Sequence, residues 1–181
     1  MKINKQEFHS KGLIYTIQSA TARESEALSY LRAQIDGETE NMDREKGEAF
    51  MDAYAFEKLI HSDTASSSNL FLVAIVKERI VGYSRCEGIN LKRFHHKVEF
   101  GVGVLKDFWG YSIGKNLLIE SISWADSIGI KKMTLNVLET NQKAIDLYKR
   151  YGFEVEGILK KDRYLSDGKF YSTVVMGRSH D

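Results

Sequence analysis

The sequence has very few residues of the types that build covalent or metal crosslinks. Cys86 is the only cysteine among 181 residues, so the chain contains no internal disulfide framework and no cluster of thiolate metal ligands. The five histidines show no H-x-x-x-H spacing. We therefore expect no metal site, and we expect Cys86 to be a core residue rather than a nucleophile, because no activating partner is evident near it in the sequence.

A strong net charge is also absent, because 26 basic residues are balanced by 25 acidic ones. Proteins that bind nucleic acids by neutralising phosphates usually carry a basic excess, so we expect no nucleic-acid partner. The longest apolar run, residues 70–76, is far shorter than the roughly 20 residues that cross a bilayer. The polar N-terminal segment lacks the apolar core of a signal peptide. We expect a cytoplasmic protein with no membrane partner.

The bulk composition is that of a globular protein. Apolar residues make up 43% and charged residues 28% of the chain, and no internal repeat is present. A chain of 181 residues is long enough to bury a sizeable core. We expect a single domain over residues 1–181, with its core at about 12–178.

The first half of the chain predicts one strand and two helices. A strand is expected at 13–18, and Thr21 with Glu24 forms a capping box that opens a helix. That helix is expected to end in the acidic stretch 36–41. A second amphipathic helix is expected at about 44–61. The residues expected to face the core from this second helix are Phe50, Tyr54 and Leu59.

The second half alternates strands and helices. Strands are expected within 69–88, as a hairpin turning at 77–79, and at 97–105 and 131–139. Helices are expected from about Ser112 to Ser127 and from Asn141 to just before Gly152. A final hairpin turns at Asp167-Gly168. The order β-α-α-β-β-β-α-β-α-β-β indicates a mixed α/β fold with a mostly antiparallel sheet and one parallel crossover.

The stretch "FWGYSIGKNLL", residues 108–118, has the appearance of a phosphate-binding turn. It does not match a nucleotide P-loop, because three residues rather than four separate Gly110 from Gly114 and Asn116 replaces the Ser or Thr. A strand, a glycine-containing turn and a helix start nevertheless remain, and the free amides of a helix start bind anions. The alternative is a turn that only reverses the chain, and this stretch alone does not decide between the two.

A second motif lies in "LNVLETNQKAIDLYKRYGF", residues 135–153, where Asn141 and Tyr148 lie two turns apart on one helix. Together with residues 102–118, it resembles the GCN5-related N-acetyltransferase family. That family carries [QR]-x-x-G-x-[GA] at a strand-to-helix turn, followed by a strand and an Asn-initiated helix with a tyrosine. Here Trp109 replaces the Gln or Arg, and Ser112 replaces the first glycine of the final pair.

The resemblance implies the fold of that family, in which a parallel strand pair splays apart to admit acetyl-CoA as co-substrate. Backbone amides would grip its pyrophosphate, and Asn141 would bond the pantetheine arm or the adjacent backbone. The cofactor-binding residues implied are Val102, Gly103, Val104, Trp109, Gly110, Tyr111, Ser112, Ile113, Gly114, Lys115, Asn141, Ala144 and Tyr148.

The resemblance also implies the catalytic groups. Tyr148, a phenol with an ordinary pKa of about 10, would protonate the departing thiolate, although a tyrosine at this position also suits the core. Glu99 would be the general base, often acting through water, or a strand carboxylate paired with Lys97. Glu38 and Glu40, in the loop expected after the first helix, would attract a cationic amine or be plain surface charges.

The activity implied is direct transfer of an acetyl group to a primary amine in a ternary complex. The acceptor would be a small amine, a polyamine or a peptide N-terminus. The alternative is a non-catalytic acyl-CoA-binding or regulatory domain on the same fold. The terminal hairpin also offers an edge at which two copies could pair as a homodimer.

Overall fold

The structure is a computed structural model that describes residues 2–180. Over this range the chain forms eight strands, four α-helices and two short 3-10 turns. In chain order the elements are β1 (Gln6–Ser10), β2 (Leu13–Ser19), η1 (Ala22–Glu24), α1 (Ser25–Glu38), α2 (Ala53–Ala65), β3 (Leu70–Val76), β4 (Arg79–Gly88), β5 (Lys97–Val104), η2 (Lys106–Phe108), α3 (Ile113–Ser127), β6 (Lys132–Leu138), α4 (Gln142–Arg150), β7 (Glu154–Tyr164) and β8 (Phe170–Ser179).

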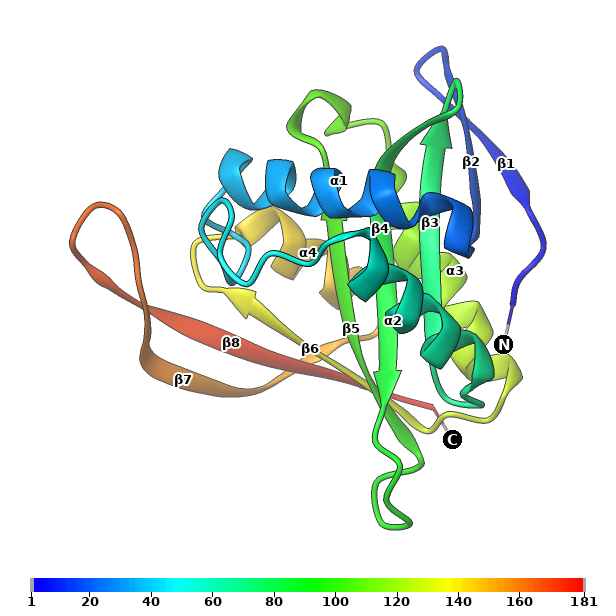
Figure 1. Ribbon diagram of the computed structural model, residues 1–181. Coiled ribbons are helices and arrows are strands. Elements are labelled where there is room, and N and C mark those ends of the chain that lie inside the picture. Colours follow the sequence, from blue (N-terminus) through cyan, green and yellow to red (C-terminus); the bar gives the residue numbers. More distant parts are fainter. Residues whose placement is uncertain (1, 181) are drawn as a thin grey trace.

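All eight strands belong to one sheet, in the order β1-β2-β3-β4-β5-β6-β8-β7 (Figure 1). Only β5 and β6 run parallel, and every other neighbouring pair is antiparallel. The predicted mixed α/β class is therefore confirmed, and the predicted order of elements holds from β2 onward. The additional strand is β1, which the sequence does not predict because Phe8 is its only apolar residue.

The helices cover the two faces of the sheet in pairs. In Figure 1, α1 and α2 lie in front of the sheet, and α3 and α4 lie behind it. Alternate residues of β4 show the same division, because Tyr83 packs on Phe71 beneath α2, whereas Ser84 lies 3.2 Å from Ser121 of α3. The front face is the α1/α2 face, and the back face is the α3/α4 face.

The second helix begins nine residues later than the prediction placed it. Asp52 caps its start by accepting a hydrogen bond from the Ala55 amide at 2.8 Å, and the residues before it form an irregular loop. The prediction that Phe50 and Tyr54 face the core is wrong, since their side chains are 56% and 63% exposed. Leu59 is half-buried against the core, as predicted. The buried apolar residues of α2 are Phe56 and Ile60.

The first helix ends within the acidic stretch in which the prediction ended it. The capping box is confirmed, because the Glu24 carboxylate accepts a hydrogen bond from the Thr21 amide at 2.6 Å, and η1 leads directly into α1. The helix then continues through Asp36 to Glu38. Asp36 is buried and pairs with Arg44 at 3.0 Å, so an acidic residue that suggested a solvated loop is a buried part of the helix.

The parallel strand pair is short. Residues 97–99 of β5 pair with residues 132–134 of β6, and no pairing continues beyond Glu99 and Thr134 along the described strands. β5 stays paired with β4 as far as Val104, while β6 stays paired with β8 as far as Leu138. The two strands therefore diverge and leave a gap within the sheet, as the family resemblance implied.

Candidate active site

The gap between β5 and β6 exposes backbone hydrogen-bonding groups of β5. In an antiparallel pair, alternate residues direct both backbone groups toward the partner strand. The Leu105 amide donates to the Val81 carbonyl at 2.9 Å, so by this alternation Gly103 also faces β4. Val102 and Val104 therefore direct their N–H and C=O groups toward the gap. Apart from the Val104 carbonyl, which accepts a hydrogen bond from Trp109, those groups are available to a ligand lying in the gap, whereas the backbone of Gly103 is occupied by β4.

The turn between β5 and α3 presents a continuous run of free amides. Within residues 2–180, no hydrogen bond engages the N–H groups of residues 110–115, and the first helical bond of α3 runs from the Asn116 amide to the Ser112 carbonyl at 2.9 Å. Gly110 and Ser112 both have positive φ values, of 83° and 63°. With the helix dipole behind them, these free amides have the arrangement that binds anions, and the phosphate-binding interpretation of this stretch stays a prediction.

Trp109 closes the turn onto the end of β5. Its indole Nε1–H donates a hydrogen bond to the Val104 carbonyl at 2.8 Å, and its side chain is 46% exposed. The contact uses the only polar hydrogen of the indole and one of the groups that face the gap. Trp109 therefore shapes the turn and offers an apolar ring, but it has no donor left for a phosphate.

Helix α4 brings Asn141 and Tyr148 behind the gap. Asn141 is at the N-cap position, but its side chain makes no capping hydrogen bond, which leaves its amide free for a ligand. Ala144, one turn further on, is half-buried against the core. The Tyr148 ring packs edge-on against Phe100 of β5 at 6.5 Å and against Phe153 at 5.7 Å.

The phenol of Tyr148 is buried but not bonded. The residue is 8% exposed, and its hydroxyl has no hydrogen-bond partner in the described part of the chain. Burial raises the pKa of Tyr148 to about 12, because the charged phenolate is poorly solvated there. The hydroxyl is thus a protonated donor at neutral pH, and it is free to bond a group entering the gap.

Glu99 lies on the front face, the opposite side of the sheet from Tyr148. It is exposed and directly opposite Glu87 of β4, and Asn136 donates to it through a long hydrogen bond of 3.5 Å. The alternative pairing with Lys97 is not present, because the Lys97 ammonium lies over the Phe94 ring, 5.0 Å from its centre. Glu99 is therefore a carboxylate without a cationic partner among residues 2–180, at the point where the strands part.

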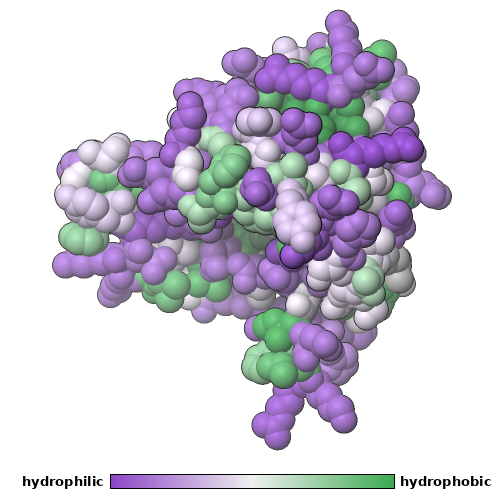
Figure 2. Space-filling view, in the orientation of Figure 1, coloured by the Kyte–Doolittle hydropathy of each residue, from purple (hydrophilic) through white to green (hydrophobic). Residues whose placement is uncertain are grey.

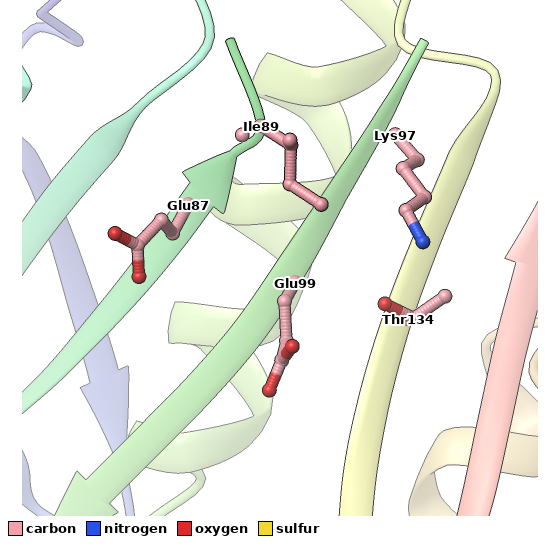
Figure 3. Close-up of a pocket in the computed structure, with 6 residues that line it drawn as sticks. Glu87, Ile89, Lys97, Glu99 and Thr134 are labelled. Carbon is pink, nitrogen blue, oxygen red and sulfur yellow. The ribbon is translucent and has the colours of Figure 1, made fainter. Parts of the chain in front are cut away.

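A shallow cavity of about 190 Å³ lies beside Glu99 (Figure 3). In this view Glu99 and Lys97 project from β5, Glu87 from β4 and Thr134 from β6. The residues that line it are Glu87, Gly88, Ile89, Lys97, Glu99 and Thr134. The sequence does not single out Glu87 and Asn136, because their approach to Glu99 depends on strand register, which no local pattern reveals.

The two glutamates predicted to attract the acceptor hold loops together instead of lining this cavity. Glu38 is the last residue of α1 rather than a loop residue, and it accepts a hydrogen bond from the Lys106 amide at 2.7 Å. Glu40 accepts one from the Ser166 amide at 2.9 Å, and hydrogen bonding to Ser166 lowers the pKa of Glu40. Their contact with an acceptor amine stays a prediction.

The remaining features of the structure concern the thiol, the potential metal ligands and the lengths of the helices. Cys86 is fully buried, and burial raises the pKa of its thiol to about 12, so it lacks the thiolate that a nucleophile requires. Across residues 2–180, no three potential metal ligands of the His, Cys, Asp or Glu type gather at one place. Over the same range, no helix is long and apolar enough to span a membrane.

The front face is largely hydrophilic, with a small apolar group over the loop between β4 and β5 at the bottom of Figure 2.

The chain matches the model of a known protein family. The model of the acetyltransferase (GNAT) family matches residues 23–153. Among curated proteins, the L-amino acid N-acetyltransferase AaaT of Escherichia coli is 31% identical over 108 residues, which are 59% of this chain and 66% of that protein. The spermidine N(1)-acetyltransferase of Thermoplasma acidophilum is 32% identical over 139 residues, which are 75% of this chain and 79% of that protein.

Solved structures share the fold over nearly the whole chain. An acetyltransferase of the GNAT family from Streptococcus pneumoniae superposes with a TM-score of 0.88 at 25% identity, covering 92% of this chain and 99% of that one. The protein yncA of Salmonella typhimurium, solved with its cofactor acetyl-CoA, superposes with a TM-score of 0.81 at 19% identity, covering 92% and 94% of the two chains.

The raised pKa of Tyr148 predicts a pH dependence of stability. Because the native phenol keeps its proton up to about pH 12 whereas an unfolded tyrosine loses it near pH 10, this residue favours folding less and less as the pH rises between these values. Relative to Tyr148→Phe, the wild type should lose up to about 1.4 kcal/mol of unfolding free energy per pH unit in this window. Urea unfolding of both proteins from about pH 9 to about pH 11 measures the difference. Parallel curves for the two proteins would contradict a buried Tyr148 phenol.

Proposed function

The chain belongs to the GNAT acetyltransferase family and is an acyltransferase, and from this premise we propose that it transfers the acetyl group of acetyl-CoA to a small primary amine. Transfer is direct, within a ternary complex of enzyme, acetyl-CoA and amine, and no acetyl group is carried on the enzyme. The burial of Cys86 agrees with this route, since the chain's one thiol is not accessible as a carrier.

The run of free amides at residues 110–115, next to the gap between β5 and β6, is the observation that carries the proposal. We infer that the pyrophosphate of coenzyme A lies on these amides and that the pantetheine arm enters the gap. There it meets the backbone groups of Val102, the free N–H of Val104 and the side chain of Asn141. The residues that hold the phosphates are Gly110, Tyr111, Ser112, Ile113, Gly114 and Lys115. The residues that shape the walls of the gap are Trp109, Ala144 and Gly103.

The proposed reaction passes through the gap from the front face to the back. The amine approaches beside Glu99, which takes its proton directly or through a water molecule, and the nitrogen attacks the thioester carbonyl. An N–C bond forms, the nitrogen releases its second proton to solvent, and the C–S bond breaks, so negative charge develops on the sulfur. Tyr148, on the other side of the sheet, donates a hydrogen bond from its hydroxyl to that sulfur.

The pKa of Tyr148 refines its proposed role. A pKa of about 12 exceeds the roughly 8.5 of an ordinary thiol, so complete proton transfer from the phenol to the thiolate is unfavourable. A hydrogen bond that strengthens as charge builds on the sulfur avoids this cost, and it favours the transition state over the bound substrate. The leaving thiolate then takes its proton from solvent.

The acceptor is proposed to be a small amine. One relative is named for L-amino acids and another for spermidine, and both classes present a primary amine. The unpaired Glu99 at the front of the gap favours an amine that arrives protonated, because the carboxylate attracts the ammonium and then accepts its proton.

The proposal is tested by titrating the protein with acetyl-CoA in a calorimeter and then measuring CoA release with a panel of amines. We expect saturable binding and release of free CoA with at least one amino acid or polyamine. The absence of binding heat would overturn the proposal. Binding without CoA release from any amine would instead favour a non-catalytic acyl-CoA-binding domain.

Replacing Tyr148 separates chemistry from binding. Tyr148→Phe should lower kcat by roughly 100-fold, because the leaving sulfur loses its donor, whereas the calorimetric Kd for acetyl-CoA should stay within about twofold. Tyr151→Phe is the matched control, since Tyr151 follows the same helix but its ring is not part of the Tyr148 cluster. An unchanged kcat in Tyr148→Phe would remove Tyr148 from the mechanism.

Replacing Glu99 should give a pH-dependent loss. Glu99→Gln should lower kcat/KM by roughly 10- to 100-fold near neutral pH, and the deficit should shrink as the pH rises, because more of the amine is then already neutral. The control is Glu87→Gln, which alters the carboxylate directly opposite Glu99 that is already bonded to Arg85 at 2.8 Å. A deficit that is constant with pH, or equal losses in both variants, would argue against Glu99 as the base.

A further inference from the structure

The hairpin formed by β1 and β2 ends beside the phosphate-binding turn. Its two-residue turn consists of Lys11 and Gly12, both with positive φ, at 49° and 79°. The Lys11 ammonium lies 3.7 Å from the point at which a Cβ on Gly110 would sit. A cation thus stands at the first residue of the free-amide run, although 99 positions separate Lys11 from Gly110 in the sequence.

The position of this hairpin is fixed by a contact with α3. The Asn116 side-chain amide donates a hydrogen bond of 2.6 Å to the Tyr15 hydroxyl. Tyr15 is 1% exposed, and Phe8 of β1 stacks on it at 5.5 Å with the rings 16° apart. Since Asn116 lies in the first turn of α3, this bond ties the hairpin to the same helix start that presents the amides. Asn116, which stands where a nucleotide P-loop has a hydroxyl, is a structural anchor here.

The Lys11 side chain has no partner within the protein. Among residues 2–180 no carboxylate forms an ion pair with it and no hydrogen bond engages its ammonium. The side chain is exposed and can rotate toward a ligand on the turn. An unpaired ammonium next to unpaired amides attracts an anion more strongly than either group does alone, because charge-assisted hydrogen bonds add to the helix dipole.

The turn itself lacks a long polar side chain at its entrance. Position 109 is a tryptophan, and its one donor is bonded to the Val104 carbonyl. No side chain at positions 109 and 110 can therefore donate to a phosphate. Lys11 brings a cation to this end of the turn, whereas Lys115 lies at its other end. The β1–β2 hairpin therefore supplies the side-chain donor that positions 109 and 110 lack.

We propose that Lys11 binds a phosphate group of coenzyme A and that the β1–β2 hairpin is part of the cofactor site. This rests on the proposed function, since it takes acetyl-CoA as the ligand of residues 110–115. Two groups of the cofactor share the required chemistry, the pyrophosphate bridge and the 3′-phosphate of the ribose. In either case the contact is a single exposed ammonium–phosphate pair. It binds the cofactor at a phosphate and makes no contact with the reacting carbonyl.

The test is calorimetric titration of Lys11→Gln with acetyl-CoA and with acetyl-dephospho-CoA, which lacks the 3′-phosphate. We expect Lys11→Gln to bind acetyl-CoA about 5- to 10-fold more weakly than wild type at low salt, with the difference shrinking as salt is added, as for any exposed pair. Lys11→Arg should restore most of the affinity. The kcat at saturating acetyl-CoA should be unchanged, since Lys11 does not reach the reacting atoms.

The matched control is Lys161→Gln. Lys161 is also an exposed lysine with positive φ, at 53°, but it lies on β7 at the opposite edge of the sheet. The Lys161→Gln variant should bind acetyl-CoA as tightly as the wild type does. This result would show that losing one positive charge, or replacing a lysine with positive φ, does not by itself weaken binding. Equal melting temperatures of Lys11→Gln and wild type, without ligand, establish that the hairpin is intact.

The titrations separate the outcomes. If the weakening by Lys11→Gln persists with acetyl-dephospho-CoA, Lys11 binds the pyrophosphate, and if it disappears, Lys11 binds the 3′-phosphate; both support the proposal. Equal affinities of Lys11→Gln and wild type for acetyl-CoA would overturn it while leaving the proposed function standing. A wild type that does not bind acetyl-CoA would instead overturn the proposed function.

Discussion

The rest of the structure depends on the point at which two parallel strands stop pairing. β5 and β6 share three residue pairs, ending at Glu99 and Thr134, and each then follows its other neighbour alone. The loss of pairing is tolerated because β5 remains bonded to β4 and β6 to β8, so each strand keeps one complete ladder. The backbone groups left over, those of Val102 and Val104, face the gap. An opening within a continuous sheet is thus obtained without a mobile loop.

This opening gives the site two sides with different properties. On the back face the Tyr148 phenol is buried among Phe100 and Phe153, where burial disfavours its charged form. On the front face Glu99 is exposed, on a largely hydrophilic surface. Because the two residues are on opposite sides of one sheet, the proposed base and the proposed hydrogen-bond donor are kept apart, although Glu99 lies on β5 and Tyr148 packs against Phe100 of the same strand. The proposed acetyl transfer uses this separation.

The turn after β5 connects the opening to the cofactor proposal. Trp109 closes back onto Val104, the helix start of α3 offers its amides, and Asn116 holds the β1–β2 hairpin alongside. These contacts join segments from the beginning and the middle of the chain around one small region. Gly114 sits close to Val104, because a Cβ added to this glycine would lie 3.7 Å from a valine methyl, so the helix start packs against the strand end.

Much of the fold was accessible from the sequence, because its signals are local. The capping box at Thr21 and Glu24, the Asp167-Gly168 turn and the glycine turn before α3 each depend on a few neighbouring residues, and all three are found as predicted. The prediction failed where the local signal was ambiguous or absent. Helix α2, capped by Asp52, starts later than the spacing of apolar residues suggested, and the polar strand β1 gave no signal at all. The placement of Asn141 at the start of α4 and of Tyr148 within that helix follows local signals in the same way, while their roles stay predictions.

The remaining features arise only when distant segments pack together. Strand register decides that Glu87 approaches Glu99 and that the pairing of β5 with β6 ends where it does. The position of Lys11 beside Gly110 depends on long-range contacts, such as the hydrogen bond between Asn116 and Tyr15, which are 101 residues apart. Such contacts are set by the packing of the whole core, since no propensity within a short window distinguishes one register from another. The sequence by itself determined most of the elements and the residues of the motif. The tertiary structure decided which face of the sheet each one occupies and what lies beside it.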